Sequence, residues 1–265
     1  MQKDTLTFTI LGSGTSTGIP VIGCRCPVCQ SRDPHNQRTR CSALISYNGR
    51  NILFDTSTDL RQQALREGLD HVDAVFYTHA HADHLHGIDD LRGFNMKSKI
   101  PIPLYGSHQT LDKVKTSFAY IFDHNAPEGY TPNLCLFPIS ETVELFGLDI
   151  RPIPLRHGSM ESYGYRCGPV AYLTDCNAIP QESLDLLANL ELLVLDGLRF
   201  TPHKTHFNIL QAVEMAQKIG AKQTLLTHLS HEVDHRIHDQ QLPGGIHLAH
   251  DGQRVSFPFP PRSNT

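Results

Sequence analysis

His79-Ala80-His81-Ala82-Asp83-His84 gathers three imidazoles and one carboxylate directly after the apolar run 74–77. Strand residues two apart point to the same face, so His79 and His81 can converge on one ion as the chain leaves a strand. Asp83 and His84 follow on the next turn and can reach a second ion beside the first. Imidazole nitrogen and carboxylate oxygen suit zinc, manganese or iron. The alternative is a polar loop whose histidines form ordinary hydrogen bonds and hold no metal, but such a loop rarely shows this spacing.

This motif resembles the signature of the metallo-β-lactamase superfamily. The resemblance implies further ligands at the ends of later apolar runs, where open sheets place their ligands: His157 after 151–156, Asp175 after 170–174 and His228 after 223–227. Taken singly, each of these residues could equally be a plain strand-end residue. The implied dinuclear site has one metal ion held by His79, His81 and His157, a second held by Asp83, His84 and His228, and Asp175 as the bridge.

A second metal site is indicated by Cys24-Arg25-Cys26-Pro27-Val28-Cys29. Three thiolates on one tight loop need a fourth ligand to complete a closed tetrahedral zinc site, and His231 is the candidate. Buried or free cysteines are one alternative. An iron–sulfur cluster is another alternative. Such clusters are held by four cysteine thiolates, and only three are clustered here. The remaining cysteines, Cys41, Cys135, Cys167 and Cys176, are expected in the core, and His235, His238, His247 and His250 are expected to be solvated.

Together the cysteine loop, the histidine motif and the late Thr227-His-Leu-Ser-His231 resemble the PhnP family of phosphodiesterases over residues 6–251. That family implies a structural zinc on the three cysteines and His231. It also implies hydrolysis of small cyclic phosphate diesters, such as a ribose cyclic phosphate or a 2′,3′-cyclic nucleotide. A family histidine acts as general acid; His206 matches it best, and His203 is the alternative. Asp83 is expected to be catalytic as well as a ligand.

The implied chemistry is a two-metal hydrolysis in which paired cations activate a water for attack on phosphorus, and His206 protonates the leaving group. A tRNA 3′-processing nuclease shares the metal core but carries a long basic insertion that this sequence lacks. A thioester or lactone hydrolase of the same superfamily is a further enzyme alternative. The non-enzyme alternative is a zinc-stabilised binding module, and the complete ligand set argues against it.

Composition limits the partners. The chain has 265 residues, 39% hydrophobic and 19% charged, with a net charge of −4. A negative net charge does not provide the positive surface that binds long nucleic acid, but it is compatible with a small phosphorylated substrate. No run of about 18 apolar residues predicts a membrane span, and the first residues lack the features of a signal peptide. With an odd count of seven cysteines, we expect a cytoplasmic protein with reduced thiols. The sequence does not decide between a monomer and a homodimer.

Alternating strand and helix patterns predict an α/β fold, namely an αββα sandwich of two mixed β-sheets with helices on the outer faces. We expect a single metallo-hydrolase domain over 1–258, with a zinc-binding loop at 23–30 and a disordered tail at 259–265. Asn48-Gly49 predicts a β-hairpin. Helices are expected at 60–67, 109–120, 182–189 and 209–219. Strands are expected at 6–11, 42–47, 51–54, 134–138, 142–146, 149–153, 163–167, 170–174, 192–196 and 223–227.

Two shorter features remain open. The glycine-rich loop 12–18 follows a predicted strand and could cradle a phosphate, but it lacks the P-loop lysine and no helix-forming run follows, which favours a tight turn beside the metal site. Asp55 closes another predicted strand. The resemblance implies that it orients a ligand histidine, whereas a helix N-cap is the alternative.

Overall fold

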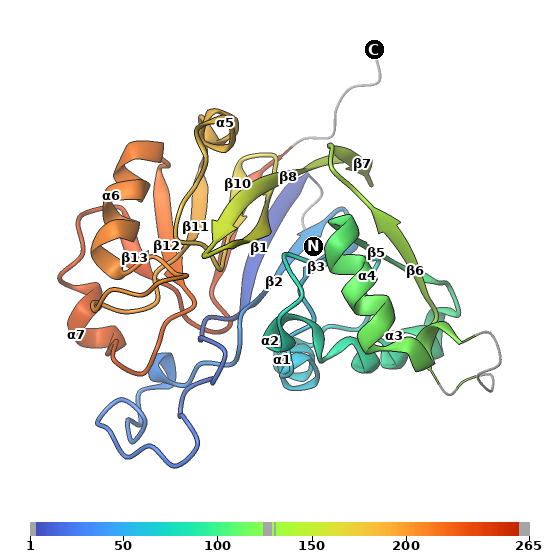
Figure 1. Cartoon of the computed structure of the whole chain (residues 1–265), viewed down its shortest axis with the longest axis horizontal. Helices are drawn as coiled ribbons and strands as arrows, with labels where there is room; N and C mark the ends of the chain where they lie inside the picture. Colours follow the sequence, from blue (N-terminus) through green and yellow to red (C-terminus); the bar gives the residue numbers. More distant parts are fainter. Residues whose placement is uncertain (1–3, 124–128, 130, 260–265) are drawn as a thin grey trace. The chain divides into compact units, whose positions relative to one another are not determined.

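The computed structural model describes residues 4–123, 129 and 131–259 (Figure 1). The chain forms two compact units. The first is built from segments 1–11, 42–140 and 254–265, and the second from segments 12–41 and 141–253. Each unit contains one seven-stranded mixed sheet.

The sheet of the first unit mixes both strand directions. β14 pairs with β1 and β2 pairs with β3 in antiparallel fashion, whereas β3, β4, β5 and β6 are parallel. Its strands, in sheet order, are β14 (Arg254–Pro258), β1 (Thr5–Gly12), β2 (Ser42–Tyr47), β3 (Arg50–Phe54), β4 (Ala74–Phe76), β5 (Ile102–Gly106) and β6 (Leu134–Pro138).

The helices of the first unit are short and pack on this sheet, with α4 in contact with β5 and β6. They are α1 (Leu60–Glu67), α2 (Ala82–Leu85), η2 (Ile88–Leu91), α3 (Arg92–Ser98), α4 (His108–Ser117) and η3 (Ala119–Phe122). The core beneath them includes Leu53, Val75, Leu104 and Leu111, all nearly inaccessible to solvent. Burial of these apolar side chains removes their surface from water and is the main force holding helices to the sheet.

The sheet of the second unit begins with antiparallel strands and continues with parallel ones. β7 to β10 form antiparallel pairs, and β10 to β13 are parallel. Its strands, in sheet order, are β13 (Ile246–Leu248), β12 (Gln223–Thr227), β11 (Leu192–Asp196), β10 (Val170–Leu173), β9 (Met160–Cys167), β8 (Leu148–His157) and β7 (Val143–Leu145).

Among the helices of this unit, α6 carries the clearest sequence signals. It packs on β11 and β12 (Figure 1), starts at a capping box formed by Asn208 and Gln211, and ends at Gly220 in the left-handed conformation. The helices of the unit are η1 (Pro34–Asn36), α5 (Gln181–Leu184), η4 (Asp185–Leu187), α6 (Ile209–Ile219) and α7 (His235–Asp239).

Most predicted elements coincide with the observed ones, and the differences have local causes. The strands predicted at 149–153 and 163–167 are longer, because β8 and β9 pair along their whole length up to His157 and Met160. The helix predicted at 109–120 ends at Ser117 and continues as the separate turn η3, and the helix predicted at 182–189 divides into α5 and η4. The hairpin is formed as expected, with Asn48 and Gly49 both at positive φ.

Ordered structure also extends further toward the C-terminus than the predicted tail at 259–265 allowed. Phe259 donates its backbone N–H to the carbonyl of Asp4 at 2.8 Å, and its ring contacts Tyr47 edge-on. The rest of the predicted tail lies outside the described residues. Among the helices in the described part of the chain, none is long and apolar enough to cross a membrane.

Three histidines of the second unit form a packed cluster. The ring of His35 stacks on His250 at a centroid distance of 4.1 Å and lies 4.6 Å from the ring of His235. Burial lowers the pKa of both His235 and His250, and the neighbouring His35 lowers them further. The expectation that His235 and His250 are solvated is therefore wrong, because the start of α7 and the turn after β13 place these rings against His35 of η1.

This cluster predicts loss of stability in mild acid. The native pKa values of His235 and His250 lie below the ordinary value of 6.5, so the unfolded chain binds more protons, and the free energy of unfolding falls as the pH drops below about 6.5. We expect His250→Gln to reduce the drop in urea midpoint between pH 7.5 and pH 5.5.

The exposed His108, which pairs with Asp112 on α4, supplies the control variant His108→Gln. It should leave the acid-induced drop as large as in the wild type. An equal drop in wild type and His250→Gln would show that the histidine cluster does not control acid stability.

Candidate metal centres

The parallel strands of the second unit bring three polar residues to one sheet edge. In the register of β10, β11 and β12, Leu173 lies beside Leu195 and Asp196 beside Thr227. Asp175, Asp196 and His228 therefore emerge together at the carboxyl ends of the three strands, where open sheets place their ligand-binding residues.

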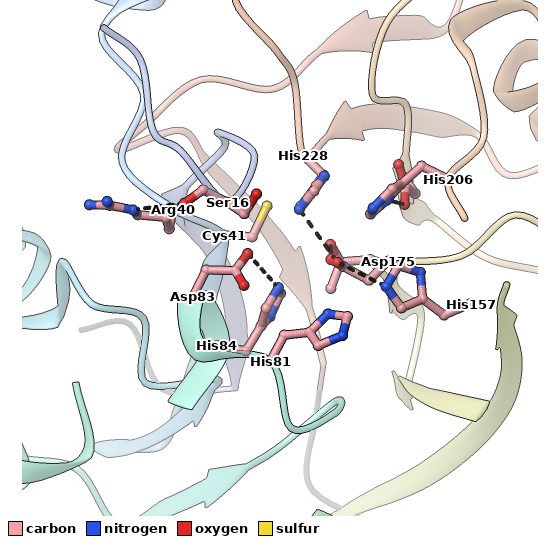
Figure 2. A network of polar contacts seen from close by, with 12 residues as sticks. Ser16, Arg40, Cys41, His81, Asp83, His84, His157, Asp175, His206 and His228 are labelled. Carbon is pink, nitrogen blue, oxygen red and sulfur yellow. Dashed lines mark hydrogen bonds and ion pairs between the residues drawn. The ribbon is translucent and has the colours of Figure 1, made fainter. Parts of the chain in front are cut away.

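Asp175 lies between two imidazoles (Figure 2). Its Oδ2 atom is 3.4 Å from Nε2 of His228 and 3.9 Å from Nε2 of His157. Two nitrogen or oxygen ligands of one tetrahedral metal ion lie about 3.4 Å apart, given bond lengths near 2.1 Å. His157 donates its Nδ1–H to the carbonyl of Thr205 at 2.7 Å, which directs Nε2 toward Asp175. The Oδ2 atom thus lies near ligand spacing from both imidazoles.

His206 adjoins the same three residues. Its ring stacks on His228 at 4.5 Å and meets His157 edge-on at 4.7 Å. Its Nδ1–H donates to Asp196 Oδ2 at 2.6 Å, so that Nε2 is the atom presented away from Asp196. One ligand atom each from Asp175, His206 and His228 lies within 4.8 Å of the others, which makes His206 a candidate ligand as well as a candidate acid.

His203, the alternative acid, lies further out. It is exposed, its Nδ1 contacts Thr205, and its ring is 5.1 Å from that of His206. Partial desolvation of the ring and the neighbouring His206 lower the pKa of His203. Asp196 is a site residue that sequence reasoning missed, although its place at the end of an apolar strand was the available signal.

The first unit carries the other predicted ligands. His79 Nε2 lies 2.8 Å from His81 Nδ1, and His84 Nε2 lies 3.3 Å from Asp83 Oδ2. His79, Asp83 and His84 are buried, whereas His81 is exposed. The motif therefore folds into two adjacent pairs of donor atoms, one of two imidazoles and one of an imidazole and a carboxylate.

Asp55 holds His84 in place. Its Oδ2 accepts the Nδ1–H of His84 at 2.7 Å, and the two carboxylate oxygens also accept the backbone N–H and the hydroxyl of Thr78. Complete burial raises the pKa of Asp55, while the contacts with His84 and Thr78 oppose that rise. The orienting contact is confirmed, and the N-cap alternative is wrong because α1 begins after Asp59.

Three of these residues have a left-handed backbone. Asp55, Asp175 and His228 have φ values of 62°, 52° and 60°. Such conformations are uncommon for residues other than glycine and cluster at functional sites. Each of the three lies just after the end of a strand, where its conformation redirects the chain.

The cysteine loop and His231 surround one point in the second unit. His231 Nδ1 lies 3.3 Å from Cys24 Sγ and 3.6 Å from both Cys26 Sγ and Cys29 Sγ. A nitrogen and a sulfur on one tetrahedral zinc ion are about 3.6 Å apart, from bond lengths near 2.1 and 2.3 Å. All four ligand atoms lie within 4.8 Å of one another. The donor set and its spacing fit a closed zinc site.

The remaining cysteines divide into two groups. Cys41, Cys167 and Cys176 are buried as predicted, but Cys135 is exposed. Cys135 lies on the edge strand β6, where alternate side chains point away from the core, so its prediction as a core residue is wrong.

Comparison with known proteins identifies the family. Residues 50–229 match the β-lactamase superfamily domain. A solved structure described as a new diphosphatase from the PhnP family is 44% identical, with 96% of this chain and 98% of that chain covered and a TM-score of 0.91. The chain therefore belongs to the metallo-β-lactamase superfamily, as a PhnP-like protein, and its two seven-stranded mixed sheets are those of the superfamily's α/β sandwich fold.

Other relatives are more distant or longer. A Porphyromonas gingivalis octanoyltransferase is 40% identical over 248 residues, which cover 92% of this chain; the chain spans half the length of that relative. The Zn²⁺-bound PqqB structure from Methylobacterium extorquens is 21% identical with a TM-score of 0.74, covering 94% of this chain and 99% of that chain, and shows the fold alone. Together the family match and the grouped histidine, aspartate and cysteine side chains support a metal-dependent hydrolase.

The cysteine site predicts one zinc ion that serves folding. Cys26→Ser removes one thiolate ligand, so we expect zinc content to fall by about one ion per chain and the melting temperature to drop, because structural zinc contributes folding free energy. Elemental analysis and thermal unfolding measure the two effects.

Cys135→Ser is the matched control, since it replaces an exposed cysteine outside the cluster. It should leave both zinc content and melting temperature near wild-type values. Unchanged zinc content and unchanged stability in Cys26→Ser would contradict a structural zinc site at the cysteine loop.

Proposed function

We propose that the chain is a metal-dependent phosphoric diester hydrolase acting on a small phosphorylated substrate. The observation that carries the proposal is the position of Asp175 Oδ2 at ligand spacing from both His157 and His228. A carboxylate shared in this way can fix the separation of two cations, which is the arrangement used for in-line displacement at phosphorus.

The proposed metal content follows the ligand sets. His79, His81 and His157 would hold one ion, Asp83, His84 and His228 the other, and Asp175 would bridge them, as the family resemblance implies. Imidazole and carboxylate donors accept manganese, zinc or iron, and the cysteine site would hold a structural zinc. When bound, such ions lower the pKa of water to near neutrality and offset the charge on phosphoryl oxygens. We also propose that both units act as one hydrolase domain in the cytoplasm.

Proton transfer and orientation of the attacking water would fall to two side chains, His206 of the second unit and Asp83 of the first. The hydrogen bond from His206 to Asp196 fixes the ring with Nε2 directed away from Asp196, and from this position His206 would donate a proton to the leaving alkoxide. Asp83, buried beside His84, would act both as a ligand and in orienting the attacking water.

Two kinds of phosphorus–oxygen bond are candidates for the bond that is hydrolysed. The resemblance found in the sequence favours a cyclic phosphate diester, such as a ribose cyclic phosphate or a 2′,3′-cyclic nucleotide. The 44%-identical relative described as a diphosphatase favours a phosphoanhydride. Both reactions are attacks of water on phosphorus with departure of an oxygen leaving group, so the same donor arrangement serves either substrate.

The proposal is tested by a substrate screen of metal-reconstituted protein. The panel contains 2′,3′-cyclic nucleotides, ribose cyclic phosphates, nucleoside diphosphate esters, a tRNA precursor, a lactone and an octanoyl thioester, the last because of the octanoyltransferase relative. We expect metal-dependent turnover of a small phosphate substrate above all others. Preference for the thioester, the lactone or tRNA, or no turnover at all, would overturn the proposal.

Replacement of Asp175 should abolish activity. Asp175→Ala removes the carboxylate at ligand spacing from His157 and His228, so we expect loss of at least one active-site metal ion. Turnover should slow by about 10³-fold or more, on the order of the loss seen when catalytic electrostatics are removed. Elemental analysis and steady-state kinetics measure the two changes. Asp185→Ala, at an exposed position on η4, is the control; retained metal and rate in Asp175→Ala would contradict the bridging role.

The acid role of His206 predicts dependence on the leaving group. His206→Ala should slow hydrolysis about 10²–10⁴-fold when the leaving group is a sugar alkoxide. The loss should be far smaller with p-nitrophenolate, which departs without a proton. The exposed His247 provides the control His247→Ala, and equal losses of His206→Ala on both substrates would assign His206 to binding or metal ligation.

A further inference from the structure

The first unit contains a cavity of about 650 Å³ lined by residues of α3, α4, η3 and β6. Pockets that hold small-molecule ligands measure roughly 300–1,000 Å³. Part of the lining is apolar: Ile121 is buried, and Phe122, Leu134 and Leu136 are partly buried against the core of the unit. The cavity therefore offers an apolar surface to a ligand of that size.

Two lysines line the cavity and have no hydrogen-bond or ion-pair partner among the described residues. Lys99 follows the end of α3, Lys115 lies in the last turn of α4, and both are exposed. Arg92 and Asp123 also line the cavity and have interactions of their own. Cationic side chains thus outnumber the single carboxylate among the lining residues, which favours an anionic ligand.

Hydrogen bonds to Asn95 fix one wall of the cavity. The buried Asn95 donates its Nδ2–H to the carbonyl of Ile100 at 2.9 Å, and its Oδ1 accepts the backbone N–H of Asn133 at 2.8 Å. The N–H of Ile102 in turn donates to the carbonyl of Asn133 at 3.0 Å. These contacts join α3 to the start of β6, which lie beside each other in Figure 1. A ligand would therefore bind without first having to order this wall.

The cavity and the histidine motif lie at opposite ends of the parallel strands. β4, β5 and β6 run in the same direction, and the motif 79–84 follows the carboxyl end of β4. Asn133 and Leu134, which line the cavity, lie at the amino end of β6. A ligand in the cavity would therefore not occupy the donor atoms of the motif.

We propose that this cavity binds a small amphiphilic anion, namely an aliphatic carboxylic acid of medium chain length. The hydrocarbon chain packs against Phe122, Leu134 and Leu136, because removal of each methylene group from water favours binding. The carboxylate lies beside Lys99 and Lys115, whose ammonium groups are compact charges on flexible stems and can adjust to a single acidic head. This inference does not depend on the reaction proposed for the metal centre.

Calorimetric binding of three probes to the metal-loaded full chain tests the proposal. Decanoate has both the chain and the charge, decan-1-ol has only the chain, and butyrate has the charge on a short chain. We expect decanoate to bind more tightly than either of the others. The double variant Lys99→Ala/Lys115→Ala should weaken decanoate binding about 3- to 30-fold, since each exposed ion pair contributes a few-fold, and should leave decan-1-ol binding unchanged. Phe122→Ala should weaken both ten-carbon probes.

Lys113→Ala is the matched control, because Lys113 is an exposed lysine of the same helix α4 that does not line the cavity. It should leave all three affinities at wild-type values. Decanoate binding that is unchanged in the double variant would overturn the proposal, and so would an equal loss in Lys113→Ala. Equal losses of decanoate and decan-1-ol in the double variant would contradict recognition of the charge. Butyrate binding as tight as that of decanoate would contradict the apolar part of the site.

Discussion

The parallel register of β10, β11 and β12 is the constraint on which the second unit's site depends. Hydrogen bonding between neighbouring strands fixes where each strand ends, and the three ends bring Asp175, Asp196 and His228 to one edge. A one-residue slip of any strand would reverse its alternation and carry its end away from this edge. The contact of Asp175 with His228 follows from that alignment, whereas His157 comes from the end of β8 and His206 from the loop between β11 and α6.

The site is maintained against unfavourable backbone conformations. Left-handed conformations of residues other than glycine cost on the order of 1–3 kcal/mol each and persist only where surrounding contacts fix them. Buried hydroxyls supply such contacts: Ser42 donates to the carbonyl of Asp55 and Ser162 to that of Asp175, each at 2.9 Å. After His228, the hydrogen bond from Leu229 to Ser13 restrains the chain in the same way. Of the eight non-glycine residues with positive φ in the described part of the chain, three therefore orient or provide donor atoms.

The segment after His228 links the candidate centres of the second unit. It carries His231 of the cysteine site three residues later, and the buried Arg38 donates to the carbonyls of Ser230 and Val233. Burial lowers the pKa of Arg38 to about 10, and the carbonyl acceptors offset part of the cost of burying its charge. Folding of the cysteine loop and placement of His228 are thus coupled through a few hydrogen bonds.

Patterns within a single segment could be read from the sequence. The strand at 42–47, the Asn48-Gly49 hairpin and the helix at 209–219 were each predicted from local residue patterns, and the structure has all three. Contacts between distant segments could not be read in this way. The pairing of Asp196 with His206, the packing of His35 on His250 and the contact of Arg40 with Ser16 depend on which strands and turns become neighbours. The prediction that Cys135 is a core residue was wrong for the same reason, because its exposure depends on β6 being an edge strand.

Metal stoichiometry and metal–metal distance in the reconstituted wild-type protein test the central claim most directly. The dinuclear assignment, together with the cysteine site, predicts three ions per chain by elemental analysis: two that a mild chelator removes together with activity, and one zinc ion that it does not. X-ray absorption should show a metal–metal separation of about 3.5–4 Å for the removable pair. A single removable ion without a metal neighbour, or full activity after removal of both ions, would contradict the dinuclear assignment.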